Sequence, residues 1–538
     1  MVGVPGRSKA CVTCRRRKKG CDKKVPFCGQ CLAMGIPCEG YERQQIWLNS
    51  EGSTQKSYTK SPSRSSSSSP SNSSPPAPAV ILHDSLTRTA RTQKFTGLFW
   101  SDYLSGGSGF SLKASGITSA KWMALYEVLS DAEASLQYVA MALSTATLGA
   151  TNNDVQLMNK SQQAYGLAMQ QMATSFISPS RNKDGILAAI QLMRVYEMLI
   201  GQQQLFGTGI SAAQKNSPVS QIKGFRKHID GETALILSRG PQDSWSSMGK
   251  QLLADGRLTL INAYISRRKR SPYSQGWKQS QLWRSVTTSP LNQLIDILVE
   301  VPALLEDLDI FREAPSNELY NSILTRCRTC EVEILALGLG FGESLTTYDY
   351  TYTREPLPIP KNDDDLAIVY LSCYYWMTCL FIYSTMGFCE LESMDSYARG
   401  PILNYPSQRI AMSYAYKIAH AIHLLFEPPA GTYSSVAAFF LLGTALRYLI
   451  MIETHGGHNI MSKERLLLVN IFTRPFLGSF VGRFLQNLQV DDGIDYGYPM
   501  DILLGMRGIE YRARVWWCGM MQAGLPEFTL EDPCYPSK

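Results

Sequence analysis

The chain has 538 residues, of which 44% are hydrophobic and 18% are charged, and its formal net charge is +7. This length allows one small module and one or two larger domains with apolar cores, and it excludes a short secreted scaffold held together by disulfides. Residues 1–48 carry ten Lys or Arg and three Asp or Glu, a net charge of +7, so the other 490 residues hold 42 basic and 42 acidic residues. This neutral remainder excludes a body that is drawn to nucleic acid by its own net charge.

Six cysteines in the first forty residues repeat one spacing twice. The pattern is C-x2-C-x6-C-x6-C-x2-C-x6-C, with the cysteines at Cys11, Cys14, Cys21, Cys28, Cys31 and Cys38. Zinc prefers four thiolate or imidazole ligands, and a C-x2-C pair on a tight turn supplies two of them. Six sulfurs can complete the shells of two zinc ions only if two sulfurs bridge both, so we predict a cluster of two Zn²⁺ ions. Three disulfides are the alternative, but they are typical of small secreted proteins, and no apolar signal segment follows Met1.

The stretch from Cys11 to Cys38 resembles the fungal binuclear zinc cluster family of transcription regulators. It shares with that family the six cysteines, the basic run in CRRRKKGCD and Pro26, which lies two residues before the fourth cysteine. The resemblance implies that the first and fourth cysteines, Cys11 and Cys28, bridge the two ions. It also implies a nuclear protein that binds double-stranded DNA.

The second cysteine is followed by five consecutive basic residues, Arg15, Arg16, Arg17, Lys18 and Lys19. A short helix can begin after each C-x2-C pair, and Gly20 and Gly35 stand where left-handed caps would end such helices. At about 100° per residue, the five side chains would surround the first helix, some facing bases and the others facing phosphates. By the resemblance, Arg17 and Lys18 read a CGG-type triplet, while Gly20 replaces a lysine that many family members have. A solvated face or a nuclear-import signal is the alternative for such a run.

Residues 49–84 form the predicted linker. Eleven of the 22 residues from Ser57 to Pro78 are serine and five are proline, which leaves too little apolar surface to offset the entropy of ordering. We therefore expect a disordered linker between a zinc cluster domain at 1–48 and a regulatory domain at 85–538. No three apolar heptads occur between Tyr41 and Ala90, so the sequence favours a monomer or a homodimer formed through the body over a coiled-coil dimer.

Helical spacing of apolar residues dominates the chain after Ser85. Leu291, Leu294, Ile295 and Leu298 show the pattern before Pro302 interrupts it. It predicts an all-α body with helices near 120–148, 153–176, 184–205, 219–238, 247–268, 290–308, 317–338, 365–389, 407–425, 433–454, 463–488 and 507–522.

The body also resembles, more loosely, the fungal-specific transcription factor domain. The stretches HIDGETALILSRG, from His228 to Gly240, and RLTLINAYISRR, ending at Arg268, carry this resemblance. The acriflavine-sensitivity-control type and regulators of metabolite gene clusters look closest. The resemblance implies an all-α regulatory domain, in which His228 is a packing or capping residue and not a ligand.

Leu366 to Cys389 is a run of 24 residues without a charge, which is long enough to cross a membrane. Hydroxyl-bearing side chains dilute its apolar character, and no Lys or Arg flanks it. We therefore predict a buried core helix and no membrane partner.

The remaining chemically active side chains carry no recognisable catalytic pattern. H-E-x-x-H, G-x-x-x-x-G-K-[ST] and G-x-S-x-G are all absent from the sequence. The histidine pairs are interpreted as polar groups, and the basic run from Arg267 to Arg270 as a solvated helix end, with an import signal as the alternative. The other cysteines are interpreted as buried, reduced thiols: Cys327, Cys330, Cys373, Cys379, Cys389, Cys518 and Cys534.

These patterns together indicate a nuclear, zinc-dependent, sequence-specific transcription factor for RNA polymerase II genes, and not an enzyme. Its partners would be DNA, transcriptional coregulators and a second copy bound through the body. The resemblance suggests control of a secondary-metabolite or drug-resistance gene set. The alternatives are a small-ligand sensor with the zinc module as a secondary tether, and an enzyme domain fused to a DNA tether.

Overall fold

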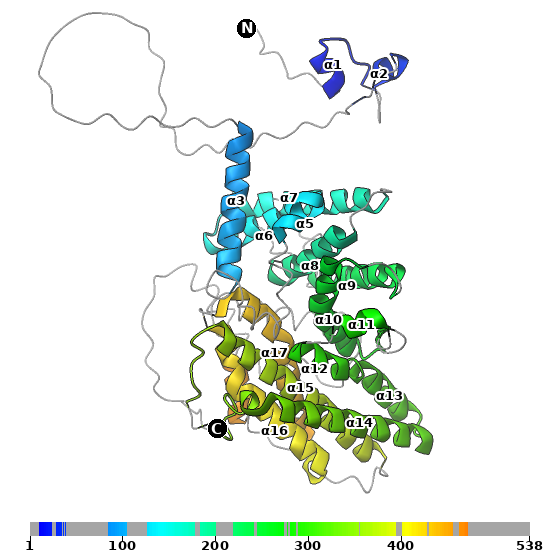
Figure 1. The fold of residues 1–538 in the computed structure, drawn as a ribbon, viewed down its shortest axis with the longest axis vertical. Coiled ribbons are helices and arrows are strands. Elements are labelled where there is room, and N and C mark those ends of the chain that lie inside the picture. The colour runs from blue at the N-terminus through cyan, green and yellow to red at the C-terminus, as the bar shows by residue number, and fades with distance from the viewer. Residues whose placement is uncertain are drawn as a thin grey trace, which may run out of the picture. The chain divides into compact units, whose positions relative to one another are not determined.

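The computed structural model describes residues 10–23, 28–34, 36, 38, 84–104, 126–177, 183–200, 219–241, 245–273, 277, 280–286, 289–353, 356–393, 401–427, 430–455 and 462–471. The chain divides into two compact units, Met1–Val80 and Ile81–Lys538. All regular elements in the described residues are helices (Figure 1). The prediction of an all-α chain is confirmed.

The first unit contains two short helices, α1 (Val12–Arg16) and α2 (Gly29–Ala33). Each begins one residue after the first cysteine of its repeat. The described core of this unit consists of four buried cysteines, against which Cys21, Ile36 and Cys38 pack.

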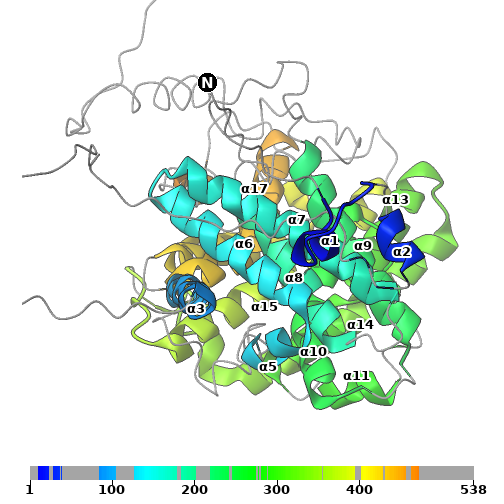
Figure 2. The ribbon, with the colours of Figure 1, turned by 90° about the horizontal axis from the view of Figure 1, so that it is seen from above.

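The second unit, here called the body, begins with six helices. They are α3 (Asp84–Tyr103), α5 (Tyr126–Ala132), α6 (Ala134–Thr151), α7 (Val155–Ile177), α8 (Lys183–Leu199) and α9 (Val219–Arg239). Helices α6 and α7 pack along each other, and α8 packs against both α6 and α9 (Figures 1 and 2).

The second half of the body is built from longer helices and short 3₁₀ turns. They are α10 (Ser247–Arg267), α11 (Gln281–Val286), α12 (Pro290–Leu298), α13 (Val301–Glu313), α14 (Asn317–Phe341), η4 (Gly342–Leu345), α15 (Asp363–Glu392), η5 (Ile402–Asn404), α16 (Pro406–Ala421), η6 (Ile422–Phe426), α17 (Gly431–His455) and α18 (Lys463–Ile471). Helix α10 contacts α8 and α9 as well as α11, α12 and α13, and α17 contacts α3 and α8 as well as α15 and α16. These two helices therefore join the halves of the body.

Two of the predicted helices are each split in two. The helix expected at 120–148 breaks at Glu133, whose carboxylate accepts a hydrogen bond from the backbone N–H of Ser135 at 3.1 Å and begins α6. The helix expected at 290–308 breaks before Pro302, which lies in the first turn of α13. Proline fits there because the first backbone N–H groups of a helix need no intrahelical acceptor.

Other predicted spans agree with the structure within a few residues, for example α10 at 247–267 and α14 at 317–341. Helices α3 and α11 were not predicted. The helix expected at 507–522 lies outside the described residues, as do residues 472–488 of the helix expected at 463–488. The predicted linker also lies outside them, except for Asp84 at the start of α3.

Helix α15 is largely buried in the body. Its side chain cap is Asn362, whose Oδ1 accepts from the backbone N–H of Asp365 at 2.9 Å, and three aspartates occupy its first turn. Helices α15 and α17 are both long and apolar enough to cross a membrane, yet 89% of the most apolar window of α15 is buried inside the body. This burial favours the predicted core helix.

The basic run from Arg267 to Arg270 ends α10, where Lys269 and Arg270 are exposed, and it is also ion-paired. Its four side chains form ion pairs with carboxylates of α9 and α13, the tightest being the paired contacts of Arg268 with Asp309 at 2.6 Å. The run therefore connects α10 to its neighbours, and its charge is balanced within the body.

The cysteines of the body behave as buried thiols in the described residues. Cys327, Cys330, Cys373, Cys379 and Cys389 are all buried and form no disulfide among the described residues, while Cys518 and Cys534 lie outside them. Burial raises the pKa of Cys379 and of Cys389 to about 12, so both thiols are protonated at neutral pH.

The two buried histidines contact polar and aromatic neighbours. His228 Nε2 lies 2.6 Å from the Tyr165 hydroxyl, and His420 stacks on Tyr350 with ring centres 4.0 Å apart. Neither belongs to a group of metal-ligating side chains in the described part of the chain.

Candidate zinc centre and nucleic-acid interface

The two cysteine repeats have the same local fold. After each C-x2-C pair the backbone turns, and a residue five positions after the second cysteine donates back to its carbonyl: Lys19 N–H to Cys14 O at 3.0 Å and Ile36 N–H to Cys31 O at 3.1 Å. This bond is the 6→1 contact of a Schellman cap. Each half therefore holds its C-x2-C pair on one tight, capped turn.

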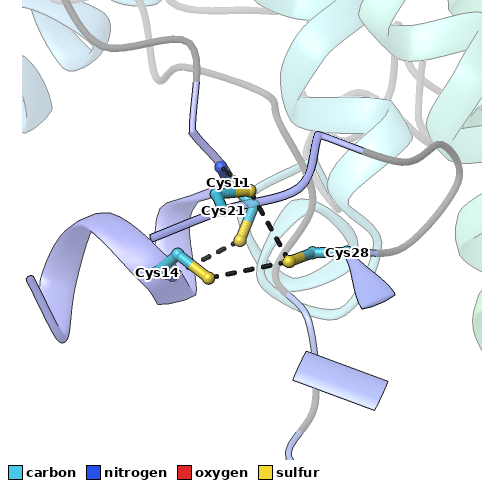
Figure 3. A group of neighbouring side chains, drawn as sticks. All are labelled: Cys11, Cys14, Cys21 and Cys28. Atoms are coloured by element: carbon cyan, nitrogen blue, oxygen red, sulfur yellow. Dashed lines mark hydrogen bonds between the residues drawn. The ribbon is translucent and has the colours of Figure 1, made fainter. Parts of the chain in front are cut away.

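The folded halves bring the six sulfurs into two overlapping groups. The first group is Cys11, Cys14, Cys21 and Cys28, and the second is Cys11, Cys31 and Cys38; within each, the sulfur atoms lie within 4.8 Å of one another. Figure 3 shows the first group, in which the sulfurs of Cys14 and Cys28 point toward each other from different halves. Cys11 is shared, and the second group is one sulfur short of four.

The separations between the sulfur atoms fit zinc and do not fit disulfides. They are 3.5 Å for Cys21 to Cys28, 3.6 Å for Cys14 to Cys28 and 3.9 Å for Cys11 to Cys31. Four sulfurs placed about 2.3 Å from one ion in a tetrahedron lie roughly 3.8 Å apart, whereas a disulfide bond is about 2.05 Å long. The donor set and its spacing therefore suit tetrahedral thiolate coordination, and the second group reaches four sulfurs if Cys28 joins it.

Backbone N–H groups point at three of these sulfurs. Cys14 N–H donates to Cys11 Sγ at 3.3 Å, Cys11 N–H to Cys21 Sγ at 3.3 Å and Cys28 N–H to Cys38 Sγ at 3.4 Å. Such bonds stabilise the negative charge of a metal-bound thiolate. Burial raises the pKa of the Cys31 thiol to about 12, so binding of zinc by its thiolate must release a proton.

Asp22, directly after the third cysteine, connects the two halves and was missed by the sequence analysis. Both of its carboxylate oxygens lie 3.0 Å from the backbone N–H of Gly29, the first residue of α2. A carboxylate at this position offsets the unsatisfied N–H groups that open a helix. The signal in the sequence was an acidic residue in an otherwise basic stretch.

The basic run does not surround a helix as predicted. Helix α1 ends at Arg16, and Lys18 has the left-handed backbone conformation, with φ of 52°. The predicted cap at Gly20 is therefore wrong, because the chain has already turned two residues earlier; Gly35 lies outside the described residues. Only Arg15 and Arg16 lie in α1, and the rest of the run leaves its end as a turn.

The described side chains of the basic run are exposed on the first unit. Arg16, Arg17, Lys18 and Lys19 are exposed, and Arg17 Nη1 lies 3.6 Å from the sulfur of Met34 in the other half. No carboxylate forms an ion pair with Arg17, Lys18 or Lys19 among the described residues of this unit. The matching positions of the second half carry apolar Leu32 and Met34, so positive charge gathers on one half.

The stretch that holds the six cysteines also matches a known protein family. Residues 9–48 match the family model described as the fungal Zn(2)-Cys(6) binuclear cluster domain. The chain carries a binuclear zinc cluster domain. Domains of this family bind two zinc ions, which agrees with the predicted cofactor and with the sulfur groups described above.

Three curated relatives match a small share of the chain. It is 41% identical over 59 residues to "Transcription factor dibT" of Pestalotiopsis microspora and 41% identical over 58 residues to "Pestheic acid cluster transcriptional regulator 3" of Pestalotiopsis fici. It is 58% identical over 33 residues to an uncharacterized transcriptional regulatory protein of Saccharomyces cerevisiae. These matches cover 11%, 11% and 6% of this chain and 9%, 10% and 2% of the relatives. No solved structure matches the chain.

Proposed function

We propose that the protein is a sequence-specific DNA-binding regulator of transcription that acts in the nucleus on RNA polymerase II genes. The observation that carries this proposal is the row of exposed basic side chains from Arg16 to Lys19 on a unit whose cysteines fit two zinc ions. The names of the matching relatives support it, since all three are transcription factors or transcriptional regulators.

Six cysteines hold the two ions in this proposal. Cys11 and Cys28 bridge the two ions. Cys14 and Cys21 complete the four ligands of one ion, and Cys31 and Cys38 complete those of the other. Support comes from the shared place of Cys11 in both sulfur groups and from the contacts of 3.5 Å and 3.6 Å that Cys28 makes in the first group. The ions have a structural role and no catalytic one. They hold the two halves of the unit in the geometry that exposes the basic residues from Arg16 to Lys19.

The basic residues divide into two roles. Arg17 and Lys18, at the turn that ends α1, reach base edges of a CGG-type triplet, while Arg15, Arg16 and Lys19 contact phosphates. Arg or Lys is the usual partner of guanine O6 and N7 in the major groove. Phosphate contacts fix the position of the protein on the duplex and supply affinity that depends on salt.

The three parts of the chain have different proposed roles. We assign residues 1–48 to DNA binding, 49–84 to a linker and 85–538 to regulation, through coregulators or a second copy bound by the body. One relative is named for the pestheic acid cluster, which supports a secondary-metabolite gene set as the target of this chain.

Selection of bound duplexes from a random pool by the zinc-loaded full chain tests the proposal. Enrichment of CGG-type triplets is expected, with one triplet for a monomer and two at fixed spacing for a dimer. Arg17→Ala should relax the preference at one base, whereas Lys23→Ala serves as the matched control, because Lys23 is an exposed lysine of the same unit outside the run. If the full chain enriches no sequence, the proposed function is wrong.

A further inference from the structure

A cavity of about 100 Å³ lies where the two halves of the body meet. Its walls come from α3, α8, α9, α10, α15 and α17, and α17 contacts both α3 and α8 directly. Seven of its 19 lining residues are aromatic: Tyr103, Phe225, Tyr370, Tyr374, Tyr433, Phe439 and Phe440. No local sequence pattern predicts this cavity, because its lining residues belong to six separate helices.

Gln191 of α8 lines this cavity, and hydrogen bonds fix the orientation of its side-chain amide. Its Nε2 donates to Glu232 Oε1 at 3.0 Å and to the carbonyl of Leu252 at 2.9 Å. Both partners are acceptors, so the amide cannot be turned around. Its Oε1 is buried and has no hydrogen-bond partner among the described residues, and the whole residue is 2% exposed.

Asn262 of α10 presents a second acceptor in the same way. Its Nδ2 donates to the Tyr374 hydroxyl at 3.2 Å, and that hydroxyl donates its only proton to the carbonyl of Ala437 at 3.1 Å. The orientation of the asparagine is thereby fixed, and its buried Oδ1 has no partner in the described structure.

Arg194 of α8 adds unused donors. Its Nη1 lies 3.1 Å from Glu232 Oε2, yet neither atom has a hydrogen bond of good geometry, and its Nε also has no partner within the described residues. The Arg194 and Glu232 charges balance each other, while Asp255, which is also buried, adds a carboxylate to the lining. A further negative charge would therefore be unfavourable here.

From this arrangement we propose that the cavity binds a small, neutral, hydroxylated aromatic molecule of about one ring. The aromatic walls would enclose the ring, its hydroxyl protons would satisfy Gln191 Oε1 and Asn262 Oδ1, and a hydroxyl or carbonyl oxygen would accept from Arg194. Leaving buried polar groups unpaired costs about 1–3 kcal/mol each. Water is the competing occupant, but it would leave the ring faces without a packing partner.

The test uses resorcinol as the probe, a single ring with two hydroxyl donors and no charge. Calorimetric titration of the full chain should give saturable binding, and resorcinol should raise the thermal unfolding temperature of the body. Benzoate, which is similar in size but anionic, and toluene, which lacks polar groups, should bind more weakly.

Variants on two walls locate the binding. Val436→Phe on α17 should fill the cavity and abolish resorcinol binding, and Thr259→Met on α10 gives a second filling from another helix if the first variant fails to fold. Asn262→Leu should weaken binding roughly tenfold, because one hydrogen bond is lost. Val332→Phe is the matched control: Val332 is 69% exposed on α14, outside the cavity lining.

Three results would overturn the proposal. They are no binding of resorcinol by the full chain, which leaves water as the occupant; unchanged binding in both cavity-filling variants; and binding of toluene or benzoate at least as tight as that of resorcinol. Because binding is measured directly, none of them depends on whether the protein reads DNA.

Discussion

The sulfur atoms of Cys14 and Cys28 lie 3.6 Å apart although the two residues belong to different halves of the first unit. Cys21 makes a similar contact with Cys28, at 3.5 Å. Apart from these sulfurs, the described core of the unit contains only Ile36 among its apolar side chains. So small a core cannot offset the entropy of ordering the chain, so the metal must supply most of the folding free energy.

Removing zinc should therefore unfold the first unit and leave the body folded. Elemental analysis of the full chain should give two zinc ions per chain, and a strong chelator should abolish DNA binding. The thermal transition of the body should not change, since its core is built without metal ligands. DNA binding that survives complete removal of zinc would contradict this account.

Asp22→Ala should weaken zinc retention without removing a sulfur ligand. The carboxylate of Asp22 joins the third cysteine's segment to the start of α2 through Gly29 N–H, and loss of a group that orients ligands typically costs 10- to 100-fold in metal affinity. Competition with a chromophoric chelator measures the effect. Lys23→Ala is the control, because Lys23 is the next residue and is also exposed, and this variant should retain zinc normally. Equal zinc retention in the two variants would show that Asp22 does not position the ligands.

Lys18→Gly should separate the charge of Lys18 from its backbone role. Glycine adopts the left-handed conformation more readily than lysine, so the turn and the zinc affinity should be preserved. DNA affinity should fall and the preference for one base of the CGG-type triplet should relax, because Lys18 is assigned to a base edge. Lys18→Val supplies the contrast, because a β-branched residue is strained at φ of 52°, and its zinc retention should also fall.

The sequence was informative where a local pattern determines the structure. The cysteine spacing predicted the sulfur cluster, and apolar periodicity located α10 and α14 within a few residues. The sequence patterns failed where the position of a turn depends on groups from other parts of the fold. Gly20 is the better intrinsic cap, yet the chain turns at Lys18 because Cys14 must stay on the turn that faces the other sulfurs.

The cavity and the buried arginines lay beyond sequence analysis for a related reason. A pattern of one helix does not show which polar side chain meets which partner after packing. Arg257 is only 2% exposed, although arginine is usually a surface residue, because α11 and α12 supply a ring and a set of oxygen atoms for it.

Arg257→Ala should destabilise the body by about 3–5 kcal/mol, the usual cost of removing one partner of a buried charged contact. Its guanidinium lies 4.0 Å from the ring centre of Trp283 and donates to Asn292 Oδ1 at 2.8 Å, so both packing and hydrogen bonds are lost. Urea unfolding measures the change. Arg267→Ala is the matched control, since its partner Asp230 is largely exposed, and it should cost less than about 1 kcal/mol; equal losses would contradict the structural role of Arg257.

The buried thiol of Cys379 should make the body less stable in alkali. Burial raises its pKa from 9.0 to about 12. Below pH 9 the thiol is protonated in both the folded and the unfolded chain, so its contribution to stability is fully present. Between pH 9 and about 12 only the unfolded chain loses the proton, so the free energy of unfolding should fall as the pH rises. Urea unfolding at pH 7, 9 and 10.5 should show this fall, and Cys379→Ala should make it smaller; an unchanged pH dependence in that variant would show that other groups, such as the buried tyrosines, cause the alkaline loss.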